Sequence, residues 1–168
     1  METSTVLERV QRGSSVLYGA CGGIWVMTLF ARPTEGDMRL ARPALEAMSR
    51  AHPAGFPTLT WVLPEAGYSM DNDARIAAAE VTQAFERAIL AQATLIEGTG
   101  FQAATVRAIV AGLDLMSRTS GARKVFSDLT AAVEWCVARR PPAARTGPPP
   151  ADVASALVSM RRSLAAPG

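Results

Sequence analysis

The side chains best suited to catalysis are sparse in this sequence. Its single histidine, His52, stands beside Pro53 at the end of a predicted helix, where a solvated imidazole is far commoner than a general base. No serine or cysteine pairs convincingly with it as the nucleophile of a triad, a site that also needs a third group to orient the base. We therefore predict no catalytic residues and no enzymatic activity.

Potential metal ligands form no recognisable pattern either. Cys21 and Cys136 are far apart, and neither has another cysteine or histidine at metal-ligand spacing. Asp71, Asn72 and Asp73 resemble the start of a cation-binding loop, but no glycine follows at the sixth position and no glutamate at the twelfth. We predict no metal and no cofactor, and we expect both cysteines to be buried and reduced.

Two loops remain as candidates for binding. Gly98, Thr99 and Gly100 follow a predicted strand and open a helix, a position where backbone N–H groups and the helix dipole can accept an anion. The loop lacks both the GxGxxG pattern and a P-loop lysine, so a turn that needs glycine for its geometry is the favoured interpretation over a phosphate or nucleotide site. The second loop is Pro64–Asn72, in which Ser69 is a possible phosphosite, with an ordinary loop serine as the favoured interpretation.

Composition bounds the class of protein. The chain has 168 residues, of which 49% are hydrophobic and 19% charged, with a formal net charge of +2. These values are typical of one globular domain. The excess of positive charge is too small to indicate a nucleic-acid-binding surface. The uncharged run Gly13–Ala31 is interrupted by Gly19, Gly22 and Gly23, so we predict no membrane insertion and a cytoplasmic protein.

The first half of the chain predicts a hairpin, a helix and a buried strand. Residues 1–13 form an uncertain leader, either an edge strand or a short helix. The following elements are strands Val16–Ala20 and Ile24–Phe30 joined by a tight turn at Cys21-Gly22-Gly23, a helix capped by Thr34 and kinked or divided by Pro43, and strand Thr58–Leu63. The last of these lies between two prolines and has a continuous apolar run, which is typical of a strand inside a sheet.

The second half alternates helix and strand. The elements are a helix capped by Asp71 with Ala77, Val81, Ala84, Phe85 and Ala88 on one face, strand Ala93–Glu97, a helix capped by a Thr99–Gln102 box, strand Arg123–Ser127, and a helix capped by Asp128. Trp25, Trp61 and Trp135 fall in or beside these elements, and we expect them to pack in the core. For Trp135→Ala we expect a loss of about 3–5 kcal/mol.

This order predicts an α/β fold with a single mixed β-sheet of about five strands in the order β-β-α-β-α-β-α-β-α, the later strands being parallel. We expect the domain to span residues 14–140. A Pro-rich linker covers 141–150, and a C-terminal tail with a possible short amphipathic helix covers 151–168. Removing residues 141–168 should leave the thermal midpoint nearly unchanged. The tail helix could dock on a partner or on its own domain.

The two candidate loops should meet at one edge of the sheet. Ligands of open α/β sheets bind at the carboxyl ends of parallel strands, and both loops follow such strands. We therefore predict a rim for a ligand or a partner at this edge, made of Tyr68, Ser69, Gly98, Thr99 and Gly100.

The element order, together with the run Lys124–Trp135 (KVFSDLTAAVEW), resembles the STAS or anti-sigma-factor-antagonist family in its divergent SpoIIAA-like branch. The resemblance covers residues 14–139. It implies a domain that docks to a protein partner or, in some branches, holds an apolar or nucleotide ligand without turnover. Better-known members carry a phosphorylatable serine in an Asp-Ser-Ser/Thr-Gly turn, whereas residues 67–73 here read Gly-Tyr-Ser-Met-Asp-Asn-Asp, so that turn is missing and Ser69 is the nearest hydroxyl.

Two functions follow as hypotheses. The first is a non-enzymatic STAS-like regulatory or scaffolding module that acts by protein–protein interaction. The sequence also leaves homodimerisation open for such a module. The alternative is a domain of the same fold that binds a small apolar or phosphorylated molecule. A docking module predicts a modest exposed patch, while a ligand binder predicts an enclosed pocket with a few polar groups.

Overall fold

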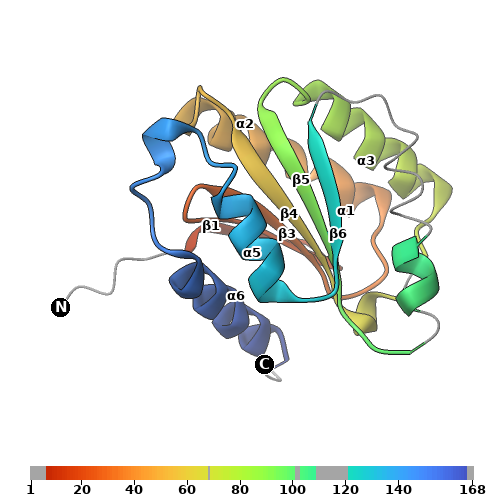
Figure 1. Cartoon of the computed structure of the whole chain (residues 1–168). Coiled ribbons are helices and arrows are strands. Elements are labelled where there is room, and N and C mark those ends of the chain that lie inside the picture. The colour runs from red at the N-terminus through yellow and green to blue at the C-terminus, as the bar shows by residue number, and fades with distance from the viewer. Residues whose placement is uncertain (1–6, 68, 101–102, 109–120, 166–168) are drawn as a thin grey trace.

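The computed structural model describes residues 7–67, 69–100, 103–108 and 121–165. These residues form one mixed β-sheet with helices on both faces (Figure 1). The strands are β1 (Leu7–Arg12), β2 (Val16–Cys21), β3 (Ile24–Leu29), β4 (Phe56–Val62), β5 (Ile89–Ile96) and β6 (Ala122–Phe126). The helices are α1 (Glu35–Arg39), α2 (Ala41–Ala51), α3 (Asn72–Ala84), α5 (Leu129–Val137) and α6 (Pro150–Ala165), with residues 103–108 also helical and 3-10 turns η1 at Pro64–Ala66 and η2 at Pro142–Ala144.

The predicted α/β fold with one mixed sheet is confirmed. The sheet has six strands in chain order rather than about five. The additional strand is β1, which pairs antiparallel with β2. Residues 7–12 of the uncertain leader are therefore an edge strand.

The strands divide into an antiparallel and a parallel half. β1, β2 and β3 are antiparallel neighbours, while β3 through β6 run parallel to one another. The β2–β3 turn has Gly22 at φ 55° and Gly23 at φ 78°, the pair of positive angles that a two-residue hairpin requires. The parallel half follows from the helix-length crossovers between its strands, as expected.

The helix after Thr34 is capped and divided as predicted. Thr34 accepts a hydrogen bond from the backbone N–H of Asp37, and the Asp37 side chain accepts one in return from the Thr34 N–H. α1 ends at Arg39 and α2 begins at Ala41. Pro43 stands in the first turn of α2, where its missing N–H has no intrahelical partner to lose.

Asp37 is a buried carboxylate that ties the β1–β2 turn to α1. Its side chain accepts hydrogen bonds from the backbone N–H groups of Ser14 (2.8 Å), Ser15 (3.3 Å) and Thr34 (3.1 Å). Its backbone oxygen accepts one of 2.7 Å from the Tyr18 hydroxyl. Burial acts to raise the pKa of Asp37, but the hydrogen bonds from Thr34, Ser14 and Ser15 outweigh it and hold the pKa below its ordinary value.

Two hydrophobic layers lie on opposite faces of the sheet. One face packs against α1, α2 and α3, and the other against α5 and α6, which lie toward the viewer in Figure 1. Alternate residues of a strand supply the two layers, as Trp25 and Val26 of β3 illustrate. The crossover helices share one face because each crossover joins neighbouring parallel strands with the same hand.

α6 is part of the folded core, which corrects the expectation that residues 141–168 can be removed at little cost. Val153 and Leu157 have no exposed surface, and Met160 is 6% exposed. All three belong to the hydrophobic layer that α5 forms with the sheet. The amphipathic pattern was visible in the sequence, but the surface that it covers is formed only after the sheet and α5 have folded.

Element boundaries differ most around β5. The sequence predicts a helix face that runs to Ala88 and a strand that begins at Ala93, whereas α3 ends at Ala84 and β5 begins at Ile89. The Ala88 carbonyl accepts a hydrogen bond of 2.9 Å from the Phe56 N–H, which brings residues before Ala93 into the sheet beside β4. Pairing with a neighbouring strand therefore overrides the local helical pattern.

Within the described residues, no helix is long and apolar enough to cross a membrane.

Candidate functional site

The carboxyl ends of β4 and β5 lie side by side, as the sequence predicts for the two candidate loops. The Glu97 N–H donates a hydrogen bond of 3.0 Å to the Val62 carbonyl, which joins the residue after β5 to the last residue of β4. Ser69 is exposed in the loop after β4, while Tyr68 lies outside the described residues. Whether Ser69 is phosphorylated stays a prediction.

The Gly98-Thr99-Gly100 turn is built around an arginine. Gly98 has φ 130° and Gly100 has φ 97°, angles that favour glycine. Arg107 Nη1 donates to the carbonyls of Ile96 (3.1 Å) and Gly98 (3.2 Å). This turn therefore presents carbonyl oxygens to a cation of its own chain, which supports the interpretation of glycine serving turn geometry. Gln102 of the predicted capping box lies outside the described residues.

Asp71 occupies the N-cap position of α3, but its side chain makes no capping hydrogen bond. It forms an ion pair with Arg32 instead, on the exposed side of the same edge. The capping role predicted for the Asp71 side chain is therefore wrong, because a charge from the segment after β3 competes for the carboxylate.

A groove of about 420 Å³ opens at this edge between the sheet, the β6–α5 loop and α6. Its apolar walls come from Trp61, Leu95, Leu129 and Val158. Its polar groups are Glu97, Ser127, Asp128, Arg161 and Arg162. An adjoining hollow of about 240 Å³ shares both arginines and reaches Phe30 and Leu63.

Glu97 is the link between the sheet and α6 in this groove. Its carboxylate accepts a hydrogen bond of 3.1 Å from Trp61 Nε1 and lies 3.0 Å from Arg161 Nη2. About a third of each side chain of the Glu97–Arg161 pair is exposed, 33% and 36% respectively. Arg162 is exposed beside them, so the groove offers a guanidinium to solvent next to apolar walls.

Asp128 bounds the groove at the N-terminus of α5. Its carboxylate accepts a hydrogen bond of 2.8 Å from the Ala131 N–H, which confirms the predicted cap. The cap satisfies a helix donor and places a negative charge opposite the arginines of α6. The groove thus combines both signs of charge and suits binding to a mixed polar and apolar surface.

Three residues of the groove were not predicted as site residues. Arg161 and Arg162 belong to the predicted C-terminal tail, and Glu97 is the last residue of a predicted strand. The spacing of Val153, Leu157 and Met160 predicts a short amphipathic helix with these residues on one side and Arg161 and Arg162 after them in the chain. The signal was therefore present, but the edge on which this helix docks could not be derived from it.

The nucleophilic and titratable groups considered for catalysis lie away from the groove. His52 is at the C-cap of α2 beside the β2–β3 turn, at the amino edge of the parallel strands. Cys21 and Cys136 are buried and form no disulfide, and burial raises the pKa of the Cys136 thiol to about 12, so that this thiol stays protonated. In the described ranges, no group of three or more His, Cys, Asp or Glu side chains is placed to hold a metal ion.

No protein-family model matches the chain, and no curated protein matches it. The chain is similar to an uncharacterized protein of the DUF3478 family with a SpoIIAA-like fold from Shewanella loihica PV-4, at 14% identity and a TM-score of 0.48, over 81% of this chain and 99% of that one.

Proposed function

We propose that this protein is a non-enzymatic regulatory or scaffolding module, and that it docks a segment of a protein partner in the groove at the carboxyl edge of the sheet. The observation that carries the proposal is the groove itself: about 420 Å³, open to solvent, with apolar walls and an exposed Arg162 at its rim. Open clefts at this edge are where α/β folds place their binding sites.

The side chains that line the groove indicate which kind of partner segment would fit it. Leu129 and Val158 offer an apolar wall to an aliphatic side chain. Arg162 offers guanidinium donors, which pair best with a carboxylate. We therefore expect a segment in which an acidic residue stands near an aliphatic one.

The alternative function, binding of a small molecule in the same groove, suits the geometry less well. Sites for small ligands bury most of the ligand surface, and this groove is open along α6. Its volume and mixed charge fit the side chains of a docked segment better than an enclosed ligand.

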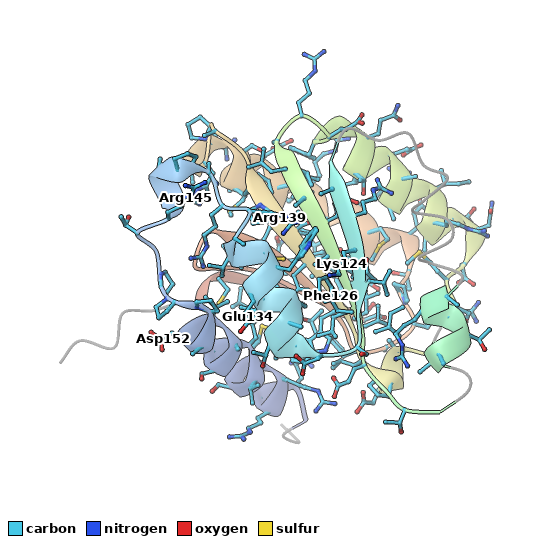
Figure 2. All side chains as sticks on the ribbon, viewed as in Figure 1. Lys124, Phe126, Glu134, Arg139, Arg145 and Asp152 are labelled. Atoms are coloured by element: carbon cyan, nitrogen blue, oxygen red, sulfur yellow. The ribbon has the colours of Figure 1, made fainter. Side chains whose placement is uncertain are left out.

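Affinity capture followed by binding measurements with the purified partner tests the proposal. The bait is the full chain, as wild type, as Arg162→Glu in the groove, and as Arg145→Glu in the matched control. Arg145 is also exposed, and it follows η2 at the opposite end of the molecule (Figure 2). We expect Arg145→Glu to bind as wild type does and Arg162→Glu to bind about tenfold more weakly, since reversing a rim charge turns an attraction into a repulsion.

Two results would count against the proposal. Equal loss of binding in both variants would indicate a non-specific effect of charge, and unchanged binding in Arg162→Glu would place the partner elsewhere. If the captured partner is a second copy of the chain, sedimentation of the wild type should show a dimer that Arg162→Glu weakens.

A further inference from the structure

Arg140 is a buried arginine where the linker to α6 leaves the end of α5. It is 2% exposed, and its Nη1 donates a hydrogen bond of 2.9 Å to the Pro148 carbonyl. Its Nε and Nη2 are also buried, but they have no hydrogen-bond partner among the described residues. Burial lowers the pKa of the guanidinium, although an arginine stays charged in a protein. The fold therefore encloses a cation that has lost most of its hydration and forms few hydrogen bonds in its place.

The groups that cover Arg140 come from the linker and from α6. A Cβ atom added at Gly22, in the β2–β3 turn, would lie 2.7 Å from Arg140 Nη2 and 2.7 Å from Pro148 Cγ. The same atom would lie 3.0 Å from Val153 Cγ2, in α6. The linker runs from the end of α5 through η2 to the start of α6 (Figure 1). Arg140 is therefore buried when the linker and α6 close over the β2–β3 turn.

Two opposing contributions decide how firmly α6 is docked. Val153, Leu157 and Met160 are buried in the hydrophobic layer with α5 and the sheet, and they stabilise the docked helix. Arg140 acts in the opposite direction, because removing a charge from water without pairing it costs free energy. That cost is recovered when the linker opens and the guanidinium is hydrated again. Undocking of α6 alone should therefore require less free energy than unfolding of the whole domain.

The two cysteines lie under different elements. Cys21 has no exposed surface, and its Sγ lies 3.9 Å from the Val153 carbonyl oxygen of α6. Cys136 belongs to α5, and its Sγ lies 3.7 Å from the Thr58 carbonyl oxygen of β4. Undocking of α6 uncovers Cys21 and leaves Cys136 between α5 and the sheet. The two thiols therefore distinguish local opening from global unfolding.

We propose that residues 141–165, named here the C-terminal strap, undock as a unit while the sheet and α5 stay folded, and that the buried charge of Arg140 promotes this opening. Undocking removes Val158, Arg161 and Arg162 from the groove at the carboxyl edge. The strap thus regulates the groove. This consequence rests on the docking function proposed above, whereas the opening itself does not and is measured without a partner.

Hydrogen–deuterium exchange of the full-length protein, followed by mass spectrometry, is the first test. We expect the amides of α6 to exchange through an opening of lower free energy and weaker denaturant dependence than those of β3 and β4. Arg140→Met removes the buried charge and keeps an apolar side chain, so the α6 amides should exchange about 5- to 100-fold more slowly than in wild type. Arg145→Met is the matched control, because Arg145 is an exposed arginine of the same linker, and it should leave their exchange unchanged.

Alkylation of the two thiols is the second test, with each rate divided by its rate in the urea-unfolded chain. We expect Cys21 to react faster than Cys136 in wild type. Gly22→Ala places a methyl group against the strap, and Cys21 should then react about 5- to 100-fold faster. Gly23→Ala is the control, because Gly23 also has a positive φ, of 78°, but a Cβ there meets no atom closer than 3.8 Å. The Cys21 rate in Gly23→Ala should stay near that of wild type.

Three results would overturn the proposal. Equal opening free energies for α6, β3 and β4 would mean that α6 leaves the sheet only in global unfolding. Equal rates for Cys21 and Cys136 would mean the same. Faster exchange of α6 in Arg140→Met would mean that the arginine holds the strap closed. If Gly22→Ala does not fold, the exchange of Arg140→Met and the wild-type thiol rates decide the question.

Discussion

The indole Nε1 of Trp61 donates a 3.1 Å hydrogen bond to the Glu97 carboxylate. Trp61 belongs to β4 and is 2% exposed, while Glu97 follows β5 and also pairs with Arg161 of α6. One carboxylate therefore connects the buried core, the rim of the sheet and the C-terminal helix.

Replacing Glu97 should lower the free energy of unfolding, and the lost hydrogen bond from Trp61 should contribute more to this than the lost ion pair with Arg161. Glu97→Ala leaves a buried indole donor without its acceptor, and we expect a loss of about 1–3 kcal/mol in the free energy of unfolding. The Glu97–Arg161 pair is partly exposed, so its coupling energy in a double-mutant cycle with Arg161→Ala should be below about 1 kcal/mol. Chemical denaturation of the four proteins measures both values, and a larger coupling energy would mean that the pair is more desolvated than its exposure indicates.

Disrupting the apolar side of α6 should destabilise the whole domain. Leu157 has no exposed surface in the layer shared with α5 and the sheet, and Leu157→Ala should cost about 2–5 kcal/mol. Ser159→Ala, at an exposed position two residues further along the helix, should stay within about 0.5 kcal/mol of wild type. Thermal unfolding compares the two, and equal midpoints would show that α6 is dispensable for stability.

Replacing Trp135 of α5 with alanine should destabilise the protein less than replacing Trp61 of β4 with alanine. Trp135 is only partly buried: it makes an edge contact with Phe126, with centroids 5.7 Å apart, and the Arg139 guanidinium lies 3.8 Å from the centre of its ring. We therefore expect Trp135→Ala to cost about 1.5–3 kcal/mol, less than the value expected for a fully buried ring.

Trp61→Ala, in contrast, should cost about 3–5 kcal/mol, because Trp61 is a buried core residue. Urea unfolding of both variants at one pH gives the comparison. A loss at position 135 that equals the loss at position 61 would place the Trp135 ring in the core.

Acid should lower the stability of the folded protein because Asp37 becomes protonated. Its folded-state pKa lies below its ordinary value, so the folded state binds this proton less readily than the unfolded state. The associated stability is fully present above the unfolded pKa of about 3.9, and it is lost as pH falls through the lower folded pKa.

Asp37→Asn isolates this contribution. The amide NH₂ cannot accept the hydrogen bonds now made to one carboxylate oxygen, so we expect a loss of about 1–3 kcal/mol at pH 7. The difference from wild type should shrink below about pH 4, where Asp37 itself becomes protonated. A difference that stays constant down to pH 2 would exclude Asp37 as the titrating group.

Local chemistry in the sequence was sufficient for much of the fold. The Gly22-Gly23 turn, the Thr34 and Asp128 caps and the division of the helix near Pro43 each depend on residues within a few positions of one another. Parallel pairing followed from the length of the crossovers. These features form as predicted because each depends on contacts between residues that are close together in the chain.

Tertiary structure decided the features that depend on which surfaces meet. The Asp71 carboxylate forms an ion pair with Arg32 and makes no capping hydrogen bond. β5 begins earlier than its local pattern predicts because β4 supplies partners for its backbone. Arg161 reaches Glu97 only when α6 docks. Each outcome is a competition between a local preference and a contact more than thirty residues away in the chain. A sequence shows the residues that can compete, but the packed geometry determines which contact forms.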